Sequence, residues 1–306
     1  MAALPFVDAE ALTRAISWKQ AIDTLGAALD SGLEVIANPP RSRVPTARGE
    51  LLLMPAESTS AVGIKLVGIA PGNAELRLPR IQALYVLLDA LTLVPRMLID
   101  GAALTALRTP ALSALAIGQL AAEDAATLIV FGSGPQAEAH VDAARAIRPI
   151  TAVTVVARRP GRADQLVSRL RSAGLDAATA GPEAVRTADI VVCATNSGVP
   201  VFDGARLGER ACVVAIGAHT PDARELDDQV FTRAVRVVIE DRATALREAG
   251  DIVLALGAGA LTADRLTTLA ELSSLPPVDG ITVFKSVGMG WQDLVIAEAA
   301  WAAINP

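Results

Sequence analysis

The stretch LIVFGSGPQAEAHVDAARAIRPITAVTVVA, from Leu128 to Ala157, decides the fold. It begins with an apolar run, Leu128 to Phe131, that is typical of a buried parallel strand. A glycine-rich turn and a helical pattern follow, and a second apolar run, Ala152 to Ala157, ends the stretch. The order of strand, G-x-G-x-x-A turn, helix and strand predicts a βαβ unit that binds a dinucleotide. An ordinary glycine turn is the alternative.

The small residues of the turn each have a physical reason. Gly132 allows the tight turn, Gly134 lets the backbone approach a pyrophosphate, and Ala137 keeps the helix close to the strand. Pro135 suits a first helical turn, and the open amides there favour an anion. The predicted cofactor contacts in this turn are Gly132, Ser133, Gly134, Pro135, Gln136 and Ala137.

The end of the second strand indicates which dinucleotide binds. An NAD site has an acidic residue about 20 residues past the glycines, which bonds the ribose 2′-hydroxyl. Here Arg158 and Arg159 follow the strand, Arg162 lies nearby, and no acid appears before Asp164. A guanidinium group matches phosphate oxygens, so NADPH is the predicted cofactor, with NADH possible. A solvated basic loop is the alternative.

The second half of the chain alternates strands with helices. Apolar runs predict strands at 128–131, 152–157, 189–194, 212–216, 235–239 and 281–284. Helical spacing predicts helices at 135–147, 161–173, 240–249 and 265–273, with a final helix at 294–303. This alternation predicts an α/β fold, a Rossmann doubly wound parallel sheet.

The first part of the chain has a different order of predicted helices and strands. One helix is expected at 9–31, a loop at 38–43, strands at 51–54 and 62–69, and a hairpin at 84–99. A helix then runs from Ala102 towards Ala122. Strands joined by short turns predict a smaller α+β domain with an antiparallel or mixed sheet.

Bulk composition excludes several classes of protein. The chain has 306 residues, is 52% hydrophobic and 20% charged, and carries a net charge of −6. Nucleic acid and anionic membranes are therefore poor partners, and the longest uncharged run, 109–122, is shorter than the roughly 20 residues that span a bilayer. No metal-ligand spacing is visible. Cys193 and Cys212 sit in apolar runs, which predicts buried thiols and a cytoplasmic protein.

Three cations stand out in the first part: Arg41, Lys65 and Arg108. Their sequence neighbours offer no obvious acid to pair with them. Arginine is suited to a bidentate grip on a carboxylate, and lysine can also pass a proton. Ordinary surface or ion-paired cations are the alternative.

Two turns after later strands of the parallel sheet carry polar side chains. Ligands bind outside the carboxyl ends of such strands, so Thr195, Asn196 and Ser197 are expected to line a nicotinamide pocket. His219, after the next strand, is placed to act as an acid or a base, and a solvated loop histidine is the alternative. His140 is interpreted as a packing or capping residue.

Several motifs together resemble the ornithine cyclodeaminase and mu-crystallin family. The matching stretches cover nearly the whole chain: PPRS at 39–42, GIKLVGIAPGN at 63–73, DGAALTALRTPALSA at 100–114, GSGPQA at 132–137, ATNS at 194–197, IGAHTPDARELD at 216–227 and FKSVGMGWQDL at 284–294.

The resemblance implies a homodimer. Its first domain, residues 1–118 with 290–306, would hold the substrate and pair the subunits, and residues 119–289 would form the dinucleotide-binding domain. It also implies that Arg41, Lys65 and Arg108 contact the substrate carboxylate and the reacting nitrogen. Lys285 and Ser286 join the expected cofactor contacts.

The chain departs from the family pattern at three places. Cyclodeaminases of the family carry an aspartate where this chain has His219, and an acid after the second strand where it has Arg158 and Arg159. Arg80 stands where the family often has threonine, and we expect it to contact the substrate. The first two changes favour the ketimine reductases of the family.

The predicted activity is NADPH-dependent reduction of cyclic ketimino acids, an oxidoreductase reaction of proline metabolism. Pyrroline-2-carboxylate would give proline, and piperideine-2-carboxylate would give pipecolate. Lys65 and His219 are the candidate catalytic residues that keep the imine nitrogen protonated. The alternatives are an NAD-dependent ornithine or lysine cyclodeaminase, an alanine dehydrogenase, and a non-catalytic protein that binds cofactor and a small ligand.

Overall fold

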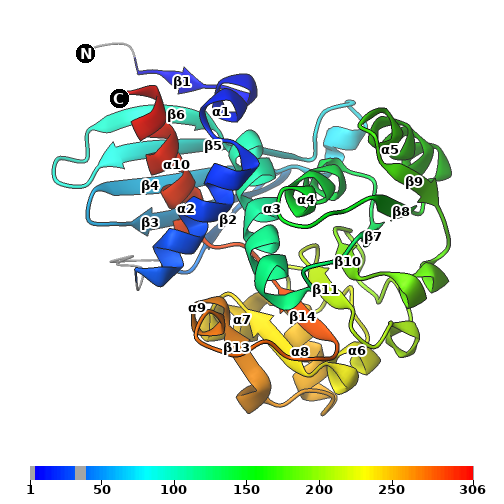
Figure 1. Ribbon diagram of the computed structural model, residues 1–306. Coiled ribbons are helices and arrows are strands. Elements are labelled where there is room, and N and C mark those ends of the chain that lie inside the picture. The colour runs from blue at the N-terminus through cyan, green and yellow to red at the C-terminus, as the bar shows by residue number, and fades with distance from the viewer. Residues whose placement is uncertain (1–3, 32–38, 306) are drawn as a thin grey trace. The chain divides into compact units, whose positions relative to one another are not determined.

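The computed structural model describes residues 4–31 and 39–305 (Figure 1). The described chain divides into two compact units, one formed by Met1–Ala111 with Gly288–Pro306 and the other by Leu112–Val287. The boundaries expected from the sequence, after residues 118 and 289, stay a prediction. Helix α3 (Gly101–Leu120) begins in the first unit and ends in the second.

The first unit contains a mixed sheet with the strand order β1-β6-β5-β4-β3-β2 among its described residues. Neighbouring strands are antiparallel, except that β1 runs parallel to β6. The strands are β1 Phe6–Val7, β2 Ser42–Thr46, β3 Gly49–Glu57, β4 Ala61–Ile69, β5 Ile81–Asp89 and β6 Pro95–Asp100. The loop expected at 38–43 is therefore shorter, because β2 begins at Ser42; Asn38 lies outside the described residues.

The helix expected at 9–31 is two helices, α1 (Ala9–Ala15) and α2 (Trp18–Asp30). The break has a local cause at Ser17, whose side chain accepts a hydrogen bond from the backbone N–H of Gln20 while the Gln20 side chain accepts one from the backbone N–H of Ser17. This capping box starts a new helix where the apolar spacing alone predicted continuity.

One face of this sheet is covered by α2 and by α10 (Gly290–Ile304), the C-terminal helix (Figure 1). A Cβ on Gly290 would lie 2.7 Å from the carbonyl oxygen of Pro55, so glycine lets the helix start against β3. The helix begins four residues before the predicted position, and these extra residues include Gln292 and Asp293.

The opposite face of the same sheet, which we call the apolar face, carries half-buried and exposed aliphatic side chains. Leu53, Leu66 and Leu84 are cross-strand neighbours on it, and so are Ile64 and Val86. Leu66 is 36% exposed. A continuous apolar sheet face of this kind is a usual signal for a protein–protein contact.

The second unit contains a parallel sheet with the order β13-β12-β14-β11-β10-β7-β8-β9 among the described residues. Its strands are β7 Thr127–Phe131, β8 Ala152–Val156, β9 Asp176–Thr179, β10 Ile190–Cys193, β11 Cys212–Ala215, β12 Arg236–Ile239, β13 Leu266–Thr268 and β14 Thr282–Lys285. Its helices after α3 are α4 Pro135–Arg145, α5 Pro160–Ser172, α6 Asp228–Arg233, α7 Arg242–Glu248, α8 Gly250–Gly257 and α9 Leu269–Leu272. The predicted doubly wound Rossmann fold is confirmed.

The central strands are buried throughout, which explains why they were visible as continuous apolar runs. One prediction here was wrong in part. The helix expected at 265–273 begins with β13, and only Leu269–Leu272 is helical. Thr268 accounts for the boundary, because it ends the strand and its side chain caps α9 in a capping box with Glu271.

His140 on α4 is a buried packing residue, as expected. Its Nδ1 lies 2.7 Å from the carbonyl oxygen of Gln136, and its Nε2 lies 3.0 Å from the hydroxyl of Ser113. Burial lowers the pKa of His140 to about 4, so the ring is neutral near pH 7. Nδ1–H therefore donates to the carbonyl, and Nε2 accepts from the serine.

Both cysteines are buried and unpaired in the structure. Among the described residues no helix is long and apolar enough to cross a bilayer.

Candidate functional site: a dinucleotide cavity and a buried cation cluster

The glycine turn after β7 adopts a conformation that only glycine allows at its first position. Gly132 has a φ of +118°, in the region that side chains disfavour. A Cβ on Gly132 would also lie 2.5 Å from the carbonyl oxygen of Ala194. The turn therefore brings the end of β7 directly against the end of β10.

Helix α4 starts at once from this turn. Gly134 is its N-cap and Pro135 its first residue. A Cβ on Gly134 would meet no atom of the described chain within 4 Å, so the backbone is open to a ligand there. Ala137 is buried against the turn. The N–H groups in the first turn of this helix point out of its start and suit a pyrophosphate.

A cavity of about 610 Å³ opens at this turn. It lies where the strand order reverses, between β7 and β10, the usual ligand position in doubly wound sheets. The predicted cofactor contacts that line it are Gly132, Ser133, Gly134, Arg158, Arg159, Thr195, Asn196 and Ser197. The geometry of the cavity thus fits a dinucleotide.

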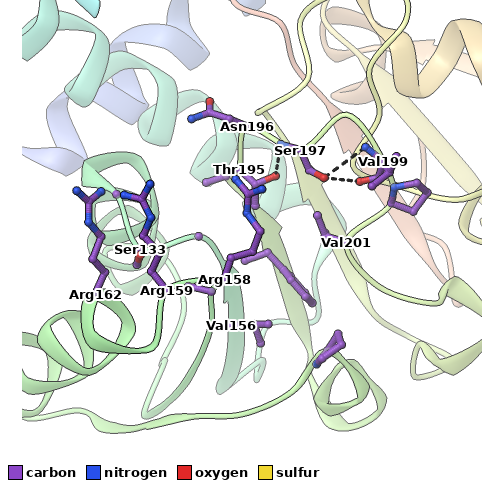
Figure 2. Close-up of a pocket in the computed structure, with 17 residues that line it drawn as sticks. Ser133, Val156, Arg158, Arg159, Arg162, Thr195, Asn196, Ser197, Val199 and Val201 are labelled. Atoms are coloured by element: carbon purple, nitrogen blue, oxygen red, sulfur yellow. Dashed lines mark hydrogen bonds between the residues drawn. The ribbon is translucent and has the colours of Figure 1, made fainter. Parts of the chain in front are cut away.

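Three arginines line one side of this cavity. Figure 2 shows Arg158, Arg159 and Arg162 extending in the same direction from the loop after β8 and the first turn of α5. Three guanidinium groups at the end of β8 can together bind a phosphate dianion.

Lys285 and Ser286, two further expected cofactor contacts, are buried in the second unit. Lys285 is buried, with its Nζ 2.8 Å from Asp251 Oδ2 and donating to the carbonyl oxygen of Ala218 at 2.6 Å. The hydroxyl of Ser286 donates to Glu240 at 2.9 Å. These two residues, like Pro135, Gln136 and Ala137 of the turn, are not among the described residues that line the cavity. Direct contact of Lys285 and Ser286 with a cofactor stays a prediction.

The first unit brings two of the three singled-out cations onto one carboxylate. Asp293, fully buried on α10, accepts hydrogen bonds from Lys65 Nζ at 2.9 and 2.8 Å. Arg108 Nε donates to the same carboxylate at 3.3 Å. Lys65 also donates to the hydroxyl of Thr105 at 3.2 Å. We call Lys65, Arg108 and Asp293 the cation cluster.

Arg108 is oriented by more than the carboxylate. Its Nη1 donates to Gln292 Oε1 at 2.5 Å. Gly288 has a φ of +79°, and a Cβ there would lie 2.6 Å from Arg108 Nη2. Arg41 Nη2 donates to the carbonyl oxygen of this glycine at 2.7 Å. The missing side chain of Gly288 therefore leaves room for the guanidinium group of Arg108, and its carbonyl oxygen binds that of Arg41.

The cluster shifts the acidity of its lysine. Burial lowers the pKa of Lys65 to about 8, and the positive charges of Arg108 and Arg41 add to this effect. The charge of Asp293 and its hydrogen bond oppose the shift. A lysine whose pKa is near 8 can release a proton at neutral pH far more readily than an exposed lysine.

The sequence interpretation missed the acid of this cluster. Asp293 lies 228 residues from Lys65, so no local pattern joins them. The available signal was the quoted stretch FKSVGMGWQDL, in which Gln292 and Asp293 directly precede an apolar run. The alternative of ion-paired cations is thus true of Lys65 and Arg108, within a buried cluster rather than on the surface.

His219 and Arg80 are the last two of the site residues predicted from the sequence. His219 lies in the turn after β11, half-buried, with Nδ1 3.1 Å from the carbonyl oxygen of Gly217. Arg80 is exposed just before β5, and its carbonyl oxygen accepts from the backbone N–H of Ala70. The catalytic role of His219 and the substrate contact of Arg80 stay predictions.

Known proteins are similar to this chain over most of their length. A Delta(1)-pyrroline-2-carboxylate reductase of Bacillus cereus is 32% identical over 258 residues, covering 81% of this chain and 79% of the relative. The structure of the Thermococcus litoralis Delta(1)-pyrroline-2-carboxylate reductase in complex with NADH and L-proline matches with a TM-score of 0.92, at 27% identity, over 99% of this chain and 98% of that one.

An archaeal alanine dehydrogenase dimer with bound NAD matches with a TM-score of 0.91, at 26% identity, over 99% of this chain and 96% of that one. The two reductases agree with the expected enzyme class, a nicotinamide-dependent oxidoreductase that acts on a C=N bond. Residues 6–304 match the ornithine cyclodeaminase/mu-crystallin family. The chain belongs to the ornithine cyclodeaminase/mu-crystallin family.

Proposed function

We propose that this protein reduces cyclic ketimino acids with NADPH, giving proline from pyrroline-2-carboxylate and pipecolate from piperideine-2-carboxylate. The observation that carries the proposal is the cation cluster, which buries Lys65 and Arg108 around one carboxylate. The similarity to two pyrroline-2-carboxylate reductases supports it. A buried lysine beside a buried arginine suits a substrate that has a carboxylate next to a basic nitrogen.

The side chains have separate roles in this proposal. Arg108 and Arg41 hold the substrate carboxylate. Arg108 uses Nε for Asp293 and one N–H of Nη1 for Gln292, which leaves the second N–H of Nη1 and those of Nη2 for the substrate. Lys65 keeps a proton on the imine nitrogen, so that the neighbouring carbon is electrophilic. Bound NADPH supplies the hydride, which adds to carbon while the proton stays on nitrogen, and C=N becomes CH–NH.

The choice of NADPH is supported by the three arginines of the cavity. The reductase and dehydrogenase structures contain NADH and NAD, which supports a nicotinamide cofactor in general. A loop with Arg158 and Arg159, and without an acid for the ribose hydroxyl, favours the 2′-phosphate. NADH remains a usable second cofactor in this proposal.

We expect Arg108→Ala to lower kcat/KM on the order of 10²-fold, because a bidentate grip and a positive charge are both lost. The measurement compares pyrroline-2-carboxylate with the same ring imine lacking its carboxylate. The loss should be confined to the carboxylated substrate. Equal losses on both substrates would show that Arg108 supports the fold of the first unit and not the ligand.

The apolar face supports a homodimer. Leu66, Ile64 and their cross-strand neighbours present an aliphatic surface that a second copy would cover. The archaeal alanine dehydrogenase is a dimer. We expect Leu66→Glu to convert the dimer to a monomer in light scattering after size exclusion. Leu246→Glu, at an exposed leucine of the second unit, is the control. A Leu66→Glu variant that stays dimeric contradicts this interface.

A cytoplasmic location is also proposed. The free, buried thiols of Cys193 and Cys212 support it, because disulfides are rare in that compartment.

The similarity to an alanine dehydrogenase favours one second candidate, reductive amination of pyruvate. A substrate panel separates the candidates: the two cyclic imino acids, pyruvate with ammonia, ornithine and lysine, each with NADPH and with NADH. We expect fast oxidation of NADPH with the cyclic imino acids only. Turnover confined to pyruvate with ammonia would replace the proposal by the second candidate.

A further inference from the structure

Three charged residues lie buried in the second unit away from the cation cluster. Glu225 and Asp251 are 0% exposed, and Lys285 is 2% exposed. Burying a charge is costly unless hydrogen bonds and opposite charges compensate. The contacts of these three residues therefore show which parts of the chain the charges hold together.

Glu225 joins the ends of two neighbouring strands. Its Oε1 accepts from the backbone N–H of Thr195 at 2.8 Å and from the hydroxyl of Thr195 at 2.7 Å, just after β10. Its Oε2 accepts from the backbone N–H of Gly217 at 2.6 Å, just after β11. A Cβ on Gly217 would lie 2.6 Å from Glu225 Oε1 and would clash with the carbonyl oxygen of Thr195. The two turns are thus locked together by one carboxylate.

Asp251 and Lys285 hold Glu225 and the second turn in place. Asp251 Oδ1, on α8, accepts from the backbone N–H groups of Glu225 and Leu226 at 2.7 and 2.8 Å. Lys285 Nζ lies 2.8 Å from Asp251 Oδ2 and donates to the carbonyl oxygen of Ala218 at 2.6 Å. Ala218 directly precedes His219, so this chain of contacts fixes the backbone that carries the histidine.

We propose that Glu225, Asp251 and Lys285 are positioning residues that fix the turns at Thr195 and His219 for the nicotinamide half of the cofactor. The inference rests on the proposed cofactor site. The pyrophosphate and the 2′-phosphate belong to the glycine turn and the arginines, which make none of these contacts. Loss of the network should therefore weaken binding of the nicotinamide half of the cofactor and leave binding of the phosphate groups unchanged.

The chain contains a matched control for the network. Asp189 also accepts three hydrogen bonds with one carboxylate, from the backbone N–H groups of Ala126 and Thr127 and from the hydroxyl of Thr127. These contacts lie at the amino ends of β7 and β10, and β10 carries the turn at Thr195 at its opposite, carboxyl end. Asp189→Asn therefore removes a similar carboxylate without touching the turns at the carboxyl ends.

The test compares binding of NADPH with binding of 2′-phospho-ADP-ribose, which lacks the nicotinamide ring, by titration calorimetry. We expect Glu225→Gln to weaken NADPH about tenfold or more, because a buried carboxylate with three donors becomes an amide that accepts fewer. The fragment should bind the variant as it binds the wild-type protein. Asp189→Asn should bind both ligands normally. Fluorescence of bound NADPH should change only in the Glu225 variant.

Lys285→Met provides a second route to the same result if Glu225→Gln does not fold, since it releases the carbonyl of Ala218. Normal NADPH binding by either folded variant overturns the inference, and so does an equal loss of both ligands, which marks a purely structural network. Equal affinity of the wild-type protein for NADPH and for the fragment also overturns the inference, because the nicotinamide half then adds nothing to binding. If the wild-type protein binds neither ligand, the proposed cofactor site itself is wrong, and the inference falls with it.

Discussion

Lys65→Met should nearly abolish reduction of pyrroline-2-carboxylate, with a loss on the order of 10²- to 10⁴-fold, while NADPH still binds. The physical reason is that hydride adds readily to a protonated C=N bond and poorly to a neutral one. Lys65 is buried, its pKa is lowered to about 8, and its partner Asp293 cannot replace it as a cation. The measurement is kcat with the cyclic imine, together with the dissociation constant of NADPH.

The pH dependence of the activity tests the same role of Lys65. Lys65 is protonated below its pKa of about 8, so activity that needs the proton should fall as the pH rises through about 8. Lys65→Met should lose this basic limb between about pH 5 and 9. Lys65→Arg keeps the charge beside Asp293 but does not release a proton, so it should be nearly as inactive.

Two further variants make the lysine experiment decisive. Lys19→Met, at an exposed lysine of α2, should leave activity unchanged. His219→Ala should cost about tenfold or less if Lys65 is the donor. The reverse order, with a small loss for Lys65→Met and a large one for His219→Ala, would assign the proton to the histidine. Full activity in both variants would exclude proton donation by either side chain.

Arg158→Asp combined with Arg159→Ala should reverse the preference for NADPH over NADH. Each charge-assisted bond to the 2′-phosphate is worth roughly 1.5–3 kcal/mol, which corresponds to about tenfold to a hundredfold in affinity. The new aspartate would also offer an acceptor for the ribose hydroxyl of NADH. The measurement is the ratio of kcat/KM values for the two cofactors at a saturating imine concentration.

The control for the cofactor variant is Arg210→Ala, at an exposed arginine that pairs with Asp279. It should leave the ratio unchanged. An unaltered ratio in the Arg158 and Arg159 variant would mean that the arginines form a solvated loop, and another part of the chain would then have to select the cofactor.

The parallel sheet was predictable because its central strands are buried on both faces. Such strands leave continuous apolar runs such as Ile190–Cys193, and the glycine turn has a fixed spacing. The missed strand β9 is short, lies at the edge of the sheet and is mostly exposed, so it leaves no apolar run. The capping boxes at Ser17 and Thr268 are local sequence signals for the start of a helix. The prediction followed the apolar spacing instead and therefore placed these helix boundaries wrongly.

The cation cluster was only half predictable. Lys65 and Arg108 stood out because a charge within an apolar run needs a reason. Asp293 could not be paired with them, because the contact joins a strand near the start of the chain to the C-terminal helix. Glu225 was hidden for a related reason, since it sits in a polar stretch, TPDARELD, that reads as an exposed loop although the folded chain buries this side chain completely.

The most direct test of the proposed activity is the stoichiometry of one reaction, pyrroline-2-carboxylate with NADPH and purified wild-type protein. We expect one L-proline formed for each NADPH oxidised, with no ammonia released. Ammonia released from ornithine or lysine with no net change in NADPH would instead indicate a cyclodeaminase. Binding of NADPH without oxidation by any imino acid of the panel would contradict the proposed function outright.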